Sequence, residues 1–251
     1  FSSSVSVNVR REEYVYLAPT IGTKGVTTLR PCEPFLVVEG FVHKAMMGHN
    51  VFGGPERLQE AISWFVADLA KPDRLGVPLP PWRGWGVERV DVAEVFDLGS
   101  FEACTQFLHG MGLARYPRRK IRRYGDECVF FPGTTTSWKA YHKGPEFAKN
   151  SFRNYAKING EKAATAIQCQ ANNYLRIELS IKSKKLKAQY GVAPTAGQVM
   201  LKELETLQDR ETARVLKEGE TDMNTVRSTE EVQARLFEVY EDRLSRILFG
   251  T

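Results

Sequence analysis

The stretch Ser137-Trp-Lys-Ala-Tyr-His-Lys-Gly-Pro-Glu146 has the alternation of a β-strand, and its Gly-Pro pair is expected to end that strand. Side chains alternate along a strand, so Lys139, Tyr141 and Lys143 are expected on one face. A phenol beside two ammonium groups can act as a nucleophile toward a phosphate, because the cations favour the phenolate and neutralise a phosphodiester. Tyr141 is therefore a candidate nucleophile, with the two lysines as its electrostatic partners.

A second stretch, Arg176-Ile-Glu-Leu-Ser-Ile-Lys182, alternates in the same way and is expected to lie beside the first in space. Its isoleucines and leucine point to one face, and Glu178 lies between cations on the other. A carboxylate in that position can hold a divalent ion over the phosphate. The alternative is that both stretches are ordinary strands of a sheet with one solvated face, and the pattern alone favours this alternative.

The 251 residues carry a net charge of +5, which is unevenly spread along the chain. Lys202–Arg246 holds 12 acidic and 8 basic residues, so the positive excess belongs to the residues before it, which are the candidate polyanion-binding part. The four cysteines show no C-x-x-C spacing and predict reduced thiols rather than a disulfide framework or a zinc site. No apolar run is long enough to span a membrane, so no membrane partner is expected.

The pattern predicts an α+β fold, mainly an antiparallel sheet with flanking helices, followed by a helical C-terminal appendage. Residues 1–190 are expected to form the main domain, and residues 191–251 the helical segment. Strands are predicted at Phe35–Val42, Trp85–Asp97, Cys128–Phe131, Ser137–Lys143 and Leu175–Ile181. Helices are predicted at Pro55–Ala70, Phe101–Gly110 with Ser100 as N-cap, Pro145–Ala156, Glu161–Ala171 and Lys184–Tyr190.

A basic run, Arg115-Tyr-Pro-Arg-Arg-Lys-Ile-Arg-Arg-Tyr124, lies between the predicted helix after Ser100 and the strand at Cys128. Such a run suits phosphate contacts, which supply most of the affinity for nucleic acid, and Tyr116 and Tyr124 can stack on unpaired bases. A solvated basic loop is the alternative, and the sequence supports both equally. The candidate DNA-binding residues are Arg115, Arg118, Arg119, Lys120, Arg122, Arg123, Lys139 and Lys182.

Two polar positions are candidate ligands for a metal ion. Gly48-His49-Asn50 is expected where a strand meets a turn, so His49 either binds a metal or a phosphate or satisfies local backbone groups. Asp91 is a carboxylate in an apolar strand, which is costly unless it is paired or metal-bound, and Arg89 on the same face is the alternative partner. The other three histidines are isolated in the sequence, so a two-histidine metal site is not supported.

Four segments resemble, in the same order, motifs of one protein family. Lys44-Ala-Met-Met-Gly-His-Asn-Val-Phe-Gly53 is similar to the lysine-to-GHNVFG segment of filamentous-phage replication initiators of the gene II/gene X family. Arg89-Val-Asp91 resembles the R-[IV]-D strand of that family, and Ala140–Glu146 resembles its A-Y-x-K-x-x-E motif. Leu175–Leu186 resembles its R-[FIV]-E strand, which basic residues follow.

The resemblance implies a rolling-circle replication initiator, which is a metal-dependent DNA endonuclease and strand transferase. Such a protein nicks the plus strand at a phage or plasmid origin, forms a 5′-phosphotyrosine and a free 3′-OH primer, and later rejoins the strand. The site that it implies has Tyr141 as nucleophile, Lys143 as charge stabiliser, and Asp91, Glu178, Glu146 and His49 as ligands of Mg²⁺ or Mn²⁺. The implied partners are supercoiled and single-stranded origin DNA, host helicase and host polymerase, in the cytoplasm of the bacterial host.

Two other hypotheses belong to different functional classes. A non-catalytic regulator of the same family would bind origin or single-stranded DNA through the basic run, but it has no need of carboxylates beside its DNA path. A structural protein that binds partners through its helical tail accounts only for the end of the chain and predicts no salt-dependent affinity for DNA.

Overall fold

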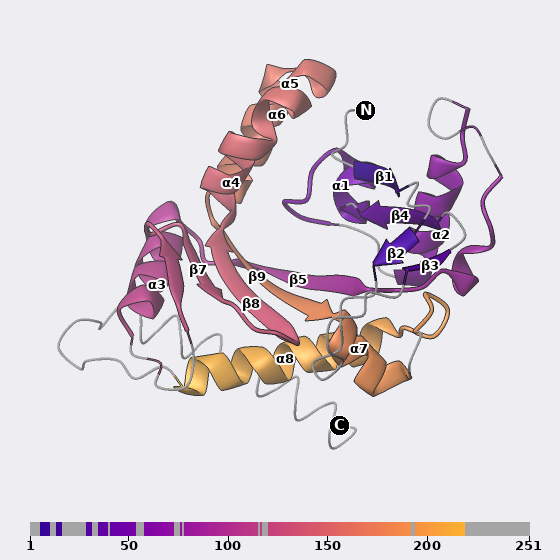
Figure 1. The fold of residues 1–251 in the computed structure, drawn as a ribbon. Helices are drawn as coiled ribbons and strands as arrows, with labels where there is room; N and C mark the ends of the chain where they lie inside the picture. The colour runs from indigo at the N-terminus through magenta and orange to yellow at the C-terminus, as the bar shows by residue number, and fades with distance from the viewer. Residues whose placement is uncertain are drawn as a thin grey trace, which may run out of the picture.

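The centre of the structure, a computed structural model, is a five-stranded antiparallel sheet (Figure 1). The described residues are 41–53, 58–72, 76, 78–114, 116, 120–191 and 194–218, together with the backbone of residues 6–10, 14–16, 29–31 and 35–39. The strand order is β5 (Arg89–Asp97), β9 (Tyr174–Lys182), β8 (Thr136–His142), β7 (Cys128–Phe131) and β6 (Arg122–Tyr124). Helices flank the sheet, so the predicted α+β class is confirmed, and the two stretches expected to be neighbours pair directly as β8 and β9.

The sheet has one apolar and one polar face, which the alternation in β9 sets. Leu175, Ile177, Leu179 and Ile181 are all fully buried, while the residues between them are partly exposed. Burying an aliphatic side chain contributes about 1.5–3 kcal/mol, so these four residues fix the register of the central strand. The polar face therefore carries whatever charged residues alternate with them.

Of the described helices, α3 (Phe101–Leu113) and α8 (Leu201–Glu218) cover most of the apolar face (Figure 1). Ser100 caps α3 as predicted, because its hydroxyl accepts a hydrogen bond from the Ala103 amide at 3.1 Å. The indole of Trp138 donates to the Thr212 hydroxyl at 3.0 Å, which fixes α8 against β8. These contacts place the core between the sheet and the two helices.

The described part of the predicted C-terminal segment belongs to the same core as the sheet. Val199, Leu204 and Val215 are buried in the cluster that contains Trp138, and the short helix α7 (Ser183–Tyr190) adds Leu186. Residues 219–251 lie outside the described part, and the division of the chain at residue 190 stays a prediction. Among the described helices, none is both long and apolar enough to cross a membrane.

The described segments of the N-terminal part form two pairs of antiparallel strands and two helices. Strand β1 (Ser6–Arg10) pairs with β4 (Phe35–Glu39), and β2 (Tyr14–Tyr16) pairs with β3 (Leu29–Pro31). They are followed by helices α1 (Val42–Met47) and α2 (Leu58–Leu69), and by a 3₁₀ turn, η1 (Trp82–Gly84).

The segment around Gly48 follows a helix, not a strand, which corrects the sequence prediction. The strand predicted to reach Val42 ends at Glu39, and α1 begins at Val42. The Gly48 amide donates to the Lys44 carbonyl at 2.9 Å, and Gly48 has φ = 76°, so it ends α1 in the left-handed conformation that glycine adopts most readily.

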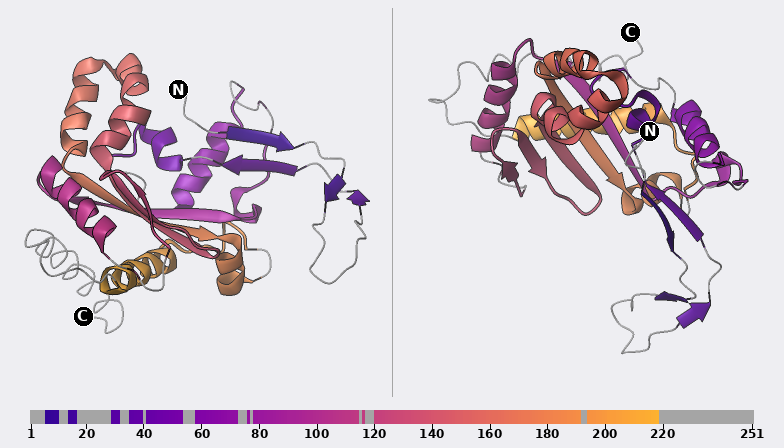
Figure 2. Two further views of the ribbon diagram at one scale, coloured as in Figure 1. Left: turned by 60° about the vertical axis from the view of Figure 1, so that its left-hand side comes forward. Right: turned by 90° about the horizontal axis from the view of Figure 1, so that it is seen from above.

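Strands β8 and β9 are joined by three helices, α4 (Lys143–Asn150), α5 (Phe152–Asn159) and α6 (Glu161–Ala171), of which α5 and α6 lie side by side (Figure 2). The prediction that Lys143 continues the strand is wrong, because β8 ends at His142 and Lys143 begins α4. Pro145 lies in the first turn of α4, where its missing N–H disrupts no helical hydrogen bond. The predicted helix Pro145–Ala156 is divided at Ser151.

Candidate active site

The polar face of the sheet brings Tyr141 next to charged residues of the neighbouring strand. Tyr141 of β8 lies directly opposite Arg176 of β9, and Lys139 lies opposite Glu178. Residues opposite each other in an antiparallel pair point to the same side, so these four side chains form two adjacent rows on one face. This face is turned away from α8, which packs on the other side of the sheet.

Tyr141 is buried, with only 6% of its surface exposed. Its hydroxyl donates to a carboxylate oxygen of Glu178 at 3.5 Å, and the ammonium of Lys139 lies 4.3 Å from the centre of its ring. Burial raises the pKa of Tyr141 above its usual value, and Glu178 raises it further, whereas Arg176 lowers it. The expected lowering by the lysines is therefore wrong, because the cost of burying a phenolate outweighs the nearby positive charge.

Lys143 is fully buried and has no exposed side-chain surface. Its ammonium donates to the side-chain oxygen of Asn50 at 2.8 Å and forms an ion pair with Glu146. Burial lowers the pKa of Lys143 to about 8, although Glu146 opposes this shift. Burial alone would raise the pKa of Glu146, but Lys143, Asn150 and Arg176 together outweigh it, and the net shift of the pKa is downward. Lys143 thus joins α4 to the segment after α1.

Arg176 is a functional candidate that was not among the site residues predicted from the sequence. One guanidinium nitrogen donates to the backbone carbonyl of Asn50 at 2.9 Å. The Nε atom lies 3.6 Å from a Glu178 oxygen and has no hydrogen-bond partner, and 11% of the side chain is exposed. The signal was present in the sequence, because residues two apart on a strand share a face and Arg176 precedes Glu178 by two. Asn50 thus accepts hydrogen bonds from both Arg176 and Lys143.

His43 and His49 lie together beside this arrangement, although they are isolated in the sequence. Their ring centres are 6.3 Å apart. The Nε2 atom of His43 donates to the Phe52 carbonyl at 3.1 Å, and burial, followed by Arg176, lowers the pKa of His43 to about 4. His49 accepts a hydrogen bond from the Val51 amide at 3.3 Å, and burial lowers its pKa too. Both imidazoles are therefore neutral near pH 7.

The four predicted metal ligands do not form one group. The guanidinium of Arg89 binds both oxygens of Asp91, with an Nε–Oδ1 distance of 2.8 Å. Asp91 lies opposite Ser180, whereas Glu178 lies opposite Ala93. The two carboxylates are therefore on the same face but offset by two residues along the strands. Within the described ranges, no three His, Cys, Asp or Glu side chains are grouped so that they could hold a metal ion.

The basic run is only partly described. Lys120, Arg122 and Arg123 are exposed, while Arg115, Arg118 and Arg119 lie outside the described residues. The expectation that both tyrosines of the run can stack on bases is wrong for Tyr116, because it is buried and its ring centre lies 4.7 Å from that of Phe131. Tyr124 is 56% exposed and remains available. The ammonium of Lys182 donates to the Gly133 carbonyl, which ties β9 to the loop before β8.

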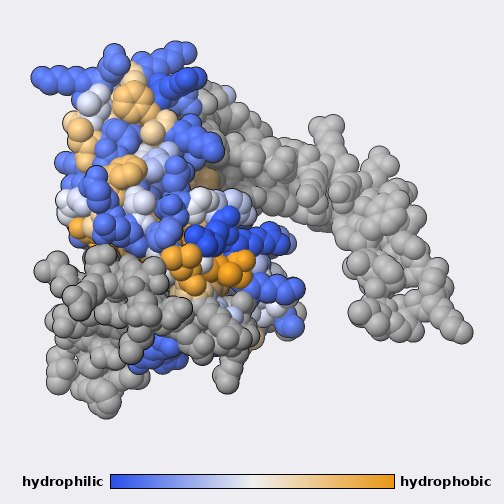
Figure 3. Space-filling view, turned by 90° about the vertical axis from the view of Figure 1, so that its left-hand side faces the viewer, coloured by the Kyte–Doolittle hydropathy of each residue, from blue (hydrophilic) through white to orange (hydrophobic). Residues whose placement is uncertain are grey.

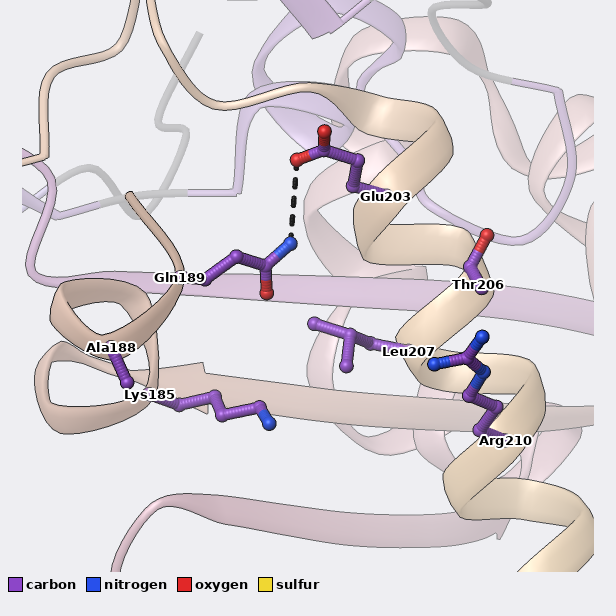
Figure 4. Close-up of a pocket in the computed structure, with 7 residues that line it drawn as sticks. All are labelled: Lys185, Ala188, Gln189, Glu203, Thr206, Leu207 and Arg210. Carbon is purple, nitrogen blue, oxygen red and sulfur yellow. Dashed lines mark hydrogen bonds between the residues drawn. The ribbon is translucent and has the colours of Figure 1, made fainter. Parts of the chain in front are cut away.

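A pocket of about 520 Å³ lies between α7 and α8, on the side of the sheet opposite Tyr141 (Figure 4). Lys185 and Arg210 point into it, and the Gln189 amide donates to Glu203 across its rim at 3.3 Å. Its lining carries both signs of charge and belongs to elements that contribute nothing to the Tyr141 arrangement. We therefore do not include it in the candidate active site.

One comparison with known proteins identifies a family. The family model that describes the N-terminal part of a gene II-type replication-associated protein matches residues 20–200, which is well over half of the chain. This range contains Tyr141, Lys143, Arg176 and Glu178, and also Asn50, which binds Lys143 and Arg176. No curated protein and no solved structure matches the chain. The resemblance in the four sequence motifs is thus confirmed, and the chain belongs to the gene II-type family of filamentous-phage replication initiators.

Proposed function

We propose that this chain nicks one strand of origin DNA by attack of Tyr141 on a phosphodiester, and later rejoins that strand. The observation that supports this proposal most directly is the position of Tyr141. It lies directly beside Arg176, its hydroxyl is directed at Glu178, and Lys139 lies over its ring. A nucleophile next to a proton acceptor and two cations is the arrangement that phosphoryl transfer requires.

In the proposed step, the Tyr141 oxygen forms a bond to phosphorus and gives its proton to the Glu178 carboxylate. The bond between phosphorus and the 3′-oxygen breaks, and the leaving oxygen takes up a proton from water to become the 3′-OH primer, while Glu178 returns its proton to water. The products are a 5′-phosphotyrosine and a free 3′ end, so one phosphodiester is exchanged for another. The reverse attack by a 3′-OH rejoins the strand without any nucleoside triphosphate.

We assign the contact with the scissile phosphate to Arg176, and a supporting role to Lys143. The guanidinium of Arg176 has five N–H donors, one nitrogen binds Asn50, and the Nε donor has no hydrogen-bond partner. Arginine binds phosphate oxygens through two parallel hydrogen bonds, which suits a charge that grows in the transition state. Lys143 is fully buried, and Glu146 and Asn50 already accept its hydrogen bonds.

A divalent ion, Mg²⁺ or Mn²⁺, remains part of the proposal. Glu178 and Glu146 are the carboxylates that lie beside the nucleophile, since Glu178 accepts the Tyr141 hydrogen bond and Glu146 pairs with Lys143, whose ammonium lies 5.7 Å from the centre of the Tyr141 ring. Asp91 and His49 have less support, because Asp91 lies two residues farther along the polar face than Glu178, and the His49 ring already accepts a hydrogen bond from the Val51 amide. When bound, such an ion supplies positive charge to the phosphate and to the leaving 3′-oxygen.

The proposed partner is origin DNA, both as a supercoiled duplex and as the displaced single strand. Host helicase would unwind the duplex and host polymerase would extend the 3′ end after nicking. The exposed cations Lys120, Arg122 and Arg123, together with exposed Tyr124, support a DNA path across the β6 edge of the sheet. Lys139 continues this path toward Tyr141, because it lies opposite Phe130, which in turn lies opposite Arg122.

The test is incubation of the chain with supercoiled plasmid that carries a filamentous-phage origin, in the presence of Mg²⁺. We expect conversion to open circles that carry protein on a 5′ end. Tyr141→Phe should abolish both products, because the phenylalanine ring keeps the packing but has no oxygen. Tyr174→Phe is the matched control, since Tyr174 belongs to the adjacent strand and has no place in the proposed step.

The outcomes separate the hypotheses. Loss of nicking in Tyr141→Phe but not in Tyr174→Phe supports the proposed nucleophile. Nicking that persists in Tyr141→Phe would refute it. The burial of Tyr141 favours a second candidate function, a non-catalytic regulator that binds origin DNA. That function predicts that the unmodified chain and Tyr141→Phe both bind DNA in a salt-sensitive way and that neither of them nicks it.

A further inference from the structure

Residues 147–171, which comprise the second half of α4 together with α5 and α6, form an antiparallel arm that projects from the sheet beyond the end of β8 (Figures 1 and 2). Its base is fixed, because the Gln168 amide donates to the Gly144 carbonyl at 3.0 Å and to the Asn172 side chain at 2.8 Å. Gly144 is in the first turn of α4, which begins directly after β8. The arm is therefore anchored within a few residues of the candidate nucleophile.

The arm is strongly basic. Residues 147–171 contain Lys149, Arg153, Lys157 and Lys162 but only one carboxylate, Glu161. All four cations are exposed, and no ion pair within the described part of the chain neutralises any of them. Hydrophilic side chains accordingly dominate the upper part of the face in Figure 3, where α5 and α6 stand.

The cations occupy the outer side of the arm because the inner side is packed. Phe152 and Tyr155 pack against the cluster of Val51 and Phe147, which joins the arm to the segment after α1. Arg153 and Lys157 are four residues apart in α5, so they are neighbours on one face of the helix, roughly opposite Tyr155. Like charges at this spacing repel one another, so the bare helix tolerates an unfavourable arrangement that an anion would relieve.

We propose that this arm binds the phosphate backbone of DNA next to the nicked bond. The proposal rests on the proposed function, since it takes origin DNA as the molecule that reaches Tyr141. DNA is a regular row of anions, which complements a row of unpaired cations. Contacts to phosphate hold the strand without reading its sequence, and exposed lysine and arginine side chains on the outer side can make them.

Binding is measured in the Tyr141→Phe protein, so that cleavage does not interfere. The arm variant adds Lys149→Gln, Arg153→Gln and Lys157→Gln, and the matched control instead adds Lys185→Gln, Lys187→Gln and Arg210→Gln. The control removes the same charge from α7 and α8, on the other side of the sheet. Fluorescence anisotropy gives the affinity for labelled origin duplex, and for its single strand, over a range of salt concentrations.

We expect the slope of log K against log salt to become shallower by about 2 to 3 in the arm variant, since each phosphate contact contributes about 0.9 for duplex DNA. The control should change the slope by less than about 1. An unchanged slope in the arm variant, or an equal change in the control, overturns the proposal while the nicking function stands. Absence of salt-dependent binding by the Tyr141→Phe parent overturns this proposal, and the separate nicking test with Tyr141 intact decides the proposed function.

Discussion

Replacing Asn50 by alanine tests the central contact of the candidate site. The Asn50 side chain accepts a hydrogen bond from Lys143 at 2.8 Å, and its backbone carbonyl accepts one from Arg176 at 2.9 Å. Asn50→Ala removes the first acceptor and keeps the second. The variant therefore isolates one hydrogen bond to a buried charge.

The expected cost follows from the burial of the ammonium group. A hydrogen bond to a charged group contributes about 1.5–3 kcal/mol, and no water reaches a side chain with no exposed surface. Glu146 still pairs with Lys143, so the charge is not left without a partner. We expect Asn50→Ala to lower the free energy of unfolding by about 2 kcal/mol, measured by urea denaturation.

A double-mutant cycle assigns this loss to one contact. Lys143→Met removes the ammonium, and in that background Asn50→Ala should cost about 1.5 kcal/mol less than in the parent, because the lost acceptor no longer has a donor. Asn50→Asp keeps an acceptor oxygen and should preserve most of the stability. A loss below about 0.5 kcal/mol in Asn50→Ala, or strict additivity in the cycle, would contradict the reasoning.

Three further predictions concern Arg176, His43 and Gly48. Arg176→Gln should slow single-turnover nicking by about 10²–10³-fold, because it removes the guanidinium from the scissile phosphate. The double variant Tyr141→Phe, Arg176→Gln should keep most of the DNA affinity of Tyr141→Phe. A nicking rate within about threefold of that of the unmodified chain would contradict the phosphate role. His43 has a folded pKa of about 4 against 6.5 when unfolded, so stability should fall as the pH drops from 6.5 toward 4, because the unfolded chain binds the proton first. In His43→Gln, the free energy of unfolding, measured by urea denaturation at each pH, should fall less steeply between pH 6.5 and pH 4. An equal fall in the variant and the unmodified chain would contradict the assignment to His43. Gly48→Ala should cost about 1–2 kcal/mol in the same assay, because Gly48 has φ = 76° and an added Cβ would lie 3.4 Å from the Tyr155 ring, and a neutral result would contradict it.

The sheet could be predicted from the sequence because its signal is local. Strand β9 was expected at Leu175–Ile181 and spans Tyr174–Lys182, since four apolar residues alternate without interruption. Helix α6 has the predicted bounds. The prediction failed at Lys143. The sequence alternation continues to this residue, but the pairing of β8 with β9 ends one residue earlier, at His142 and Leu175. It failed again at α1, whose six residues are too few to show a helical period.

The candidate site could be predicted only in part. The neighbourhood of Tyr141 and Glu178 follows from two alternating stretches that pair. The hydrogen bonds of Asn50 with Lys143 and Arg176 join positions 93 and 126 residues apart, and no local pattern specifies such contacts. The direction of the Tyr141 pKa shift depends on burial, which the surrounding elements create and a charge count along the chain does not include.

The place of β9 between β5 and β8 has a consequence for folding during synthesis. Strand β5 is made about 80 residues before its partner, an interval of roughly 4–16 s at 5–20 residues per second on the ribosome. Strands β6, β7 and β8 follow one another and can pair while synthesis continues, whereas β5 has to wait. Tyr141 meets Arg176 and Glu178 only when β9 enters this gap. A nascent chain that ends before β9 therefore carries the tyrosine without its partners, and the nicking that we propose requires a chain whose sheet is complete.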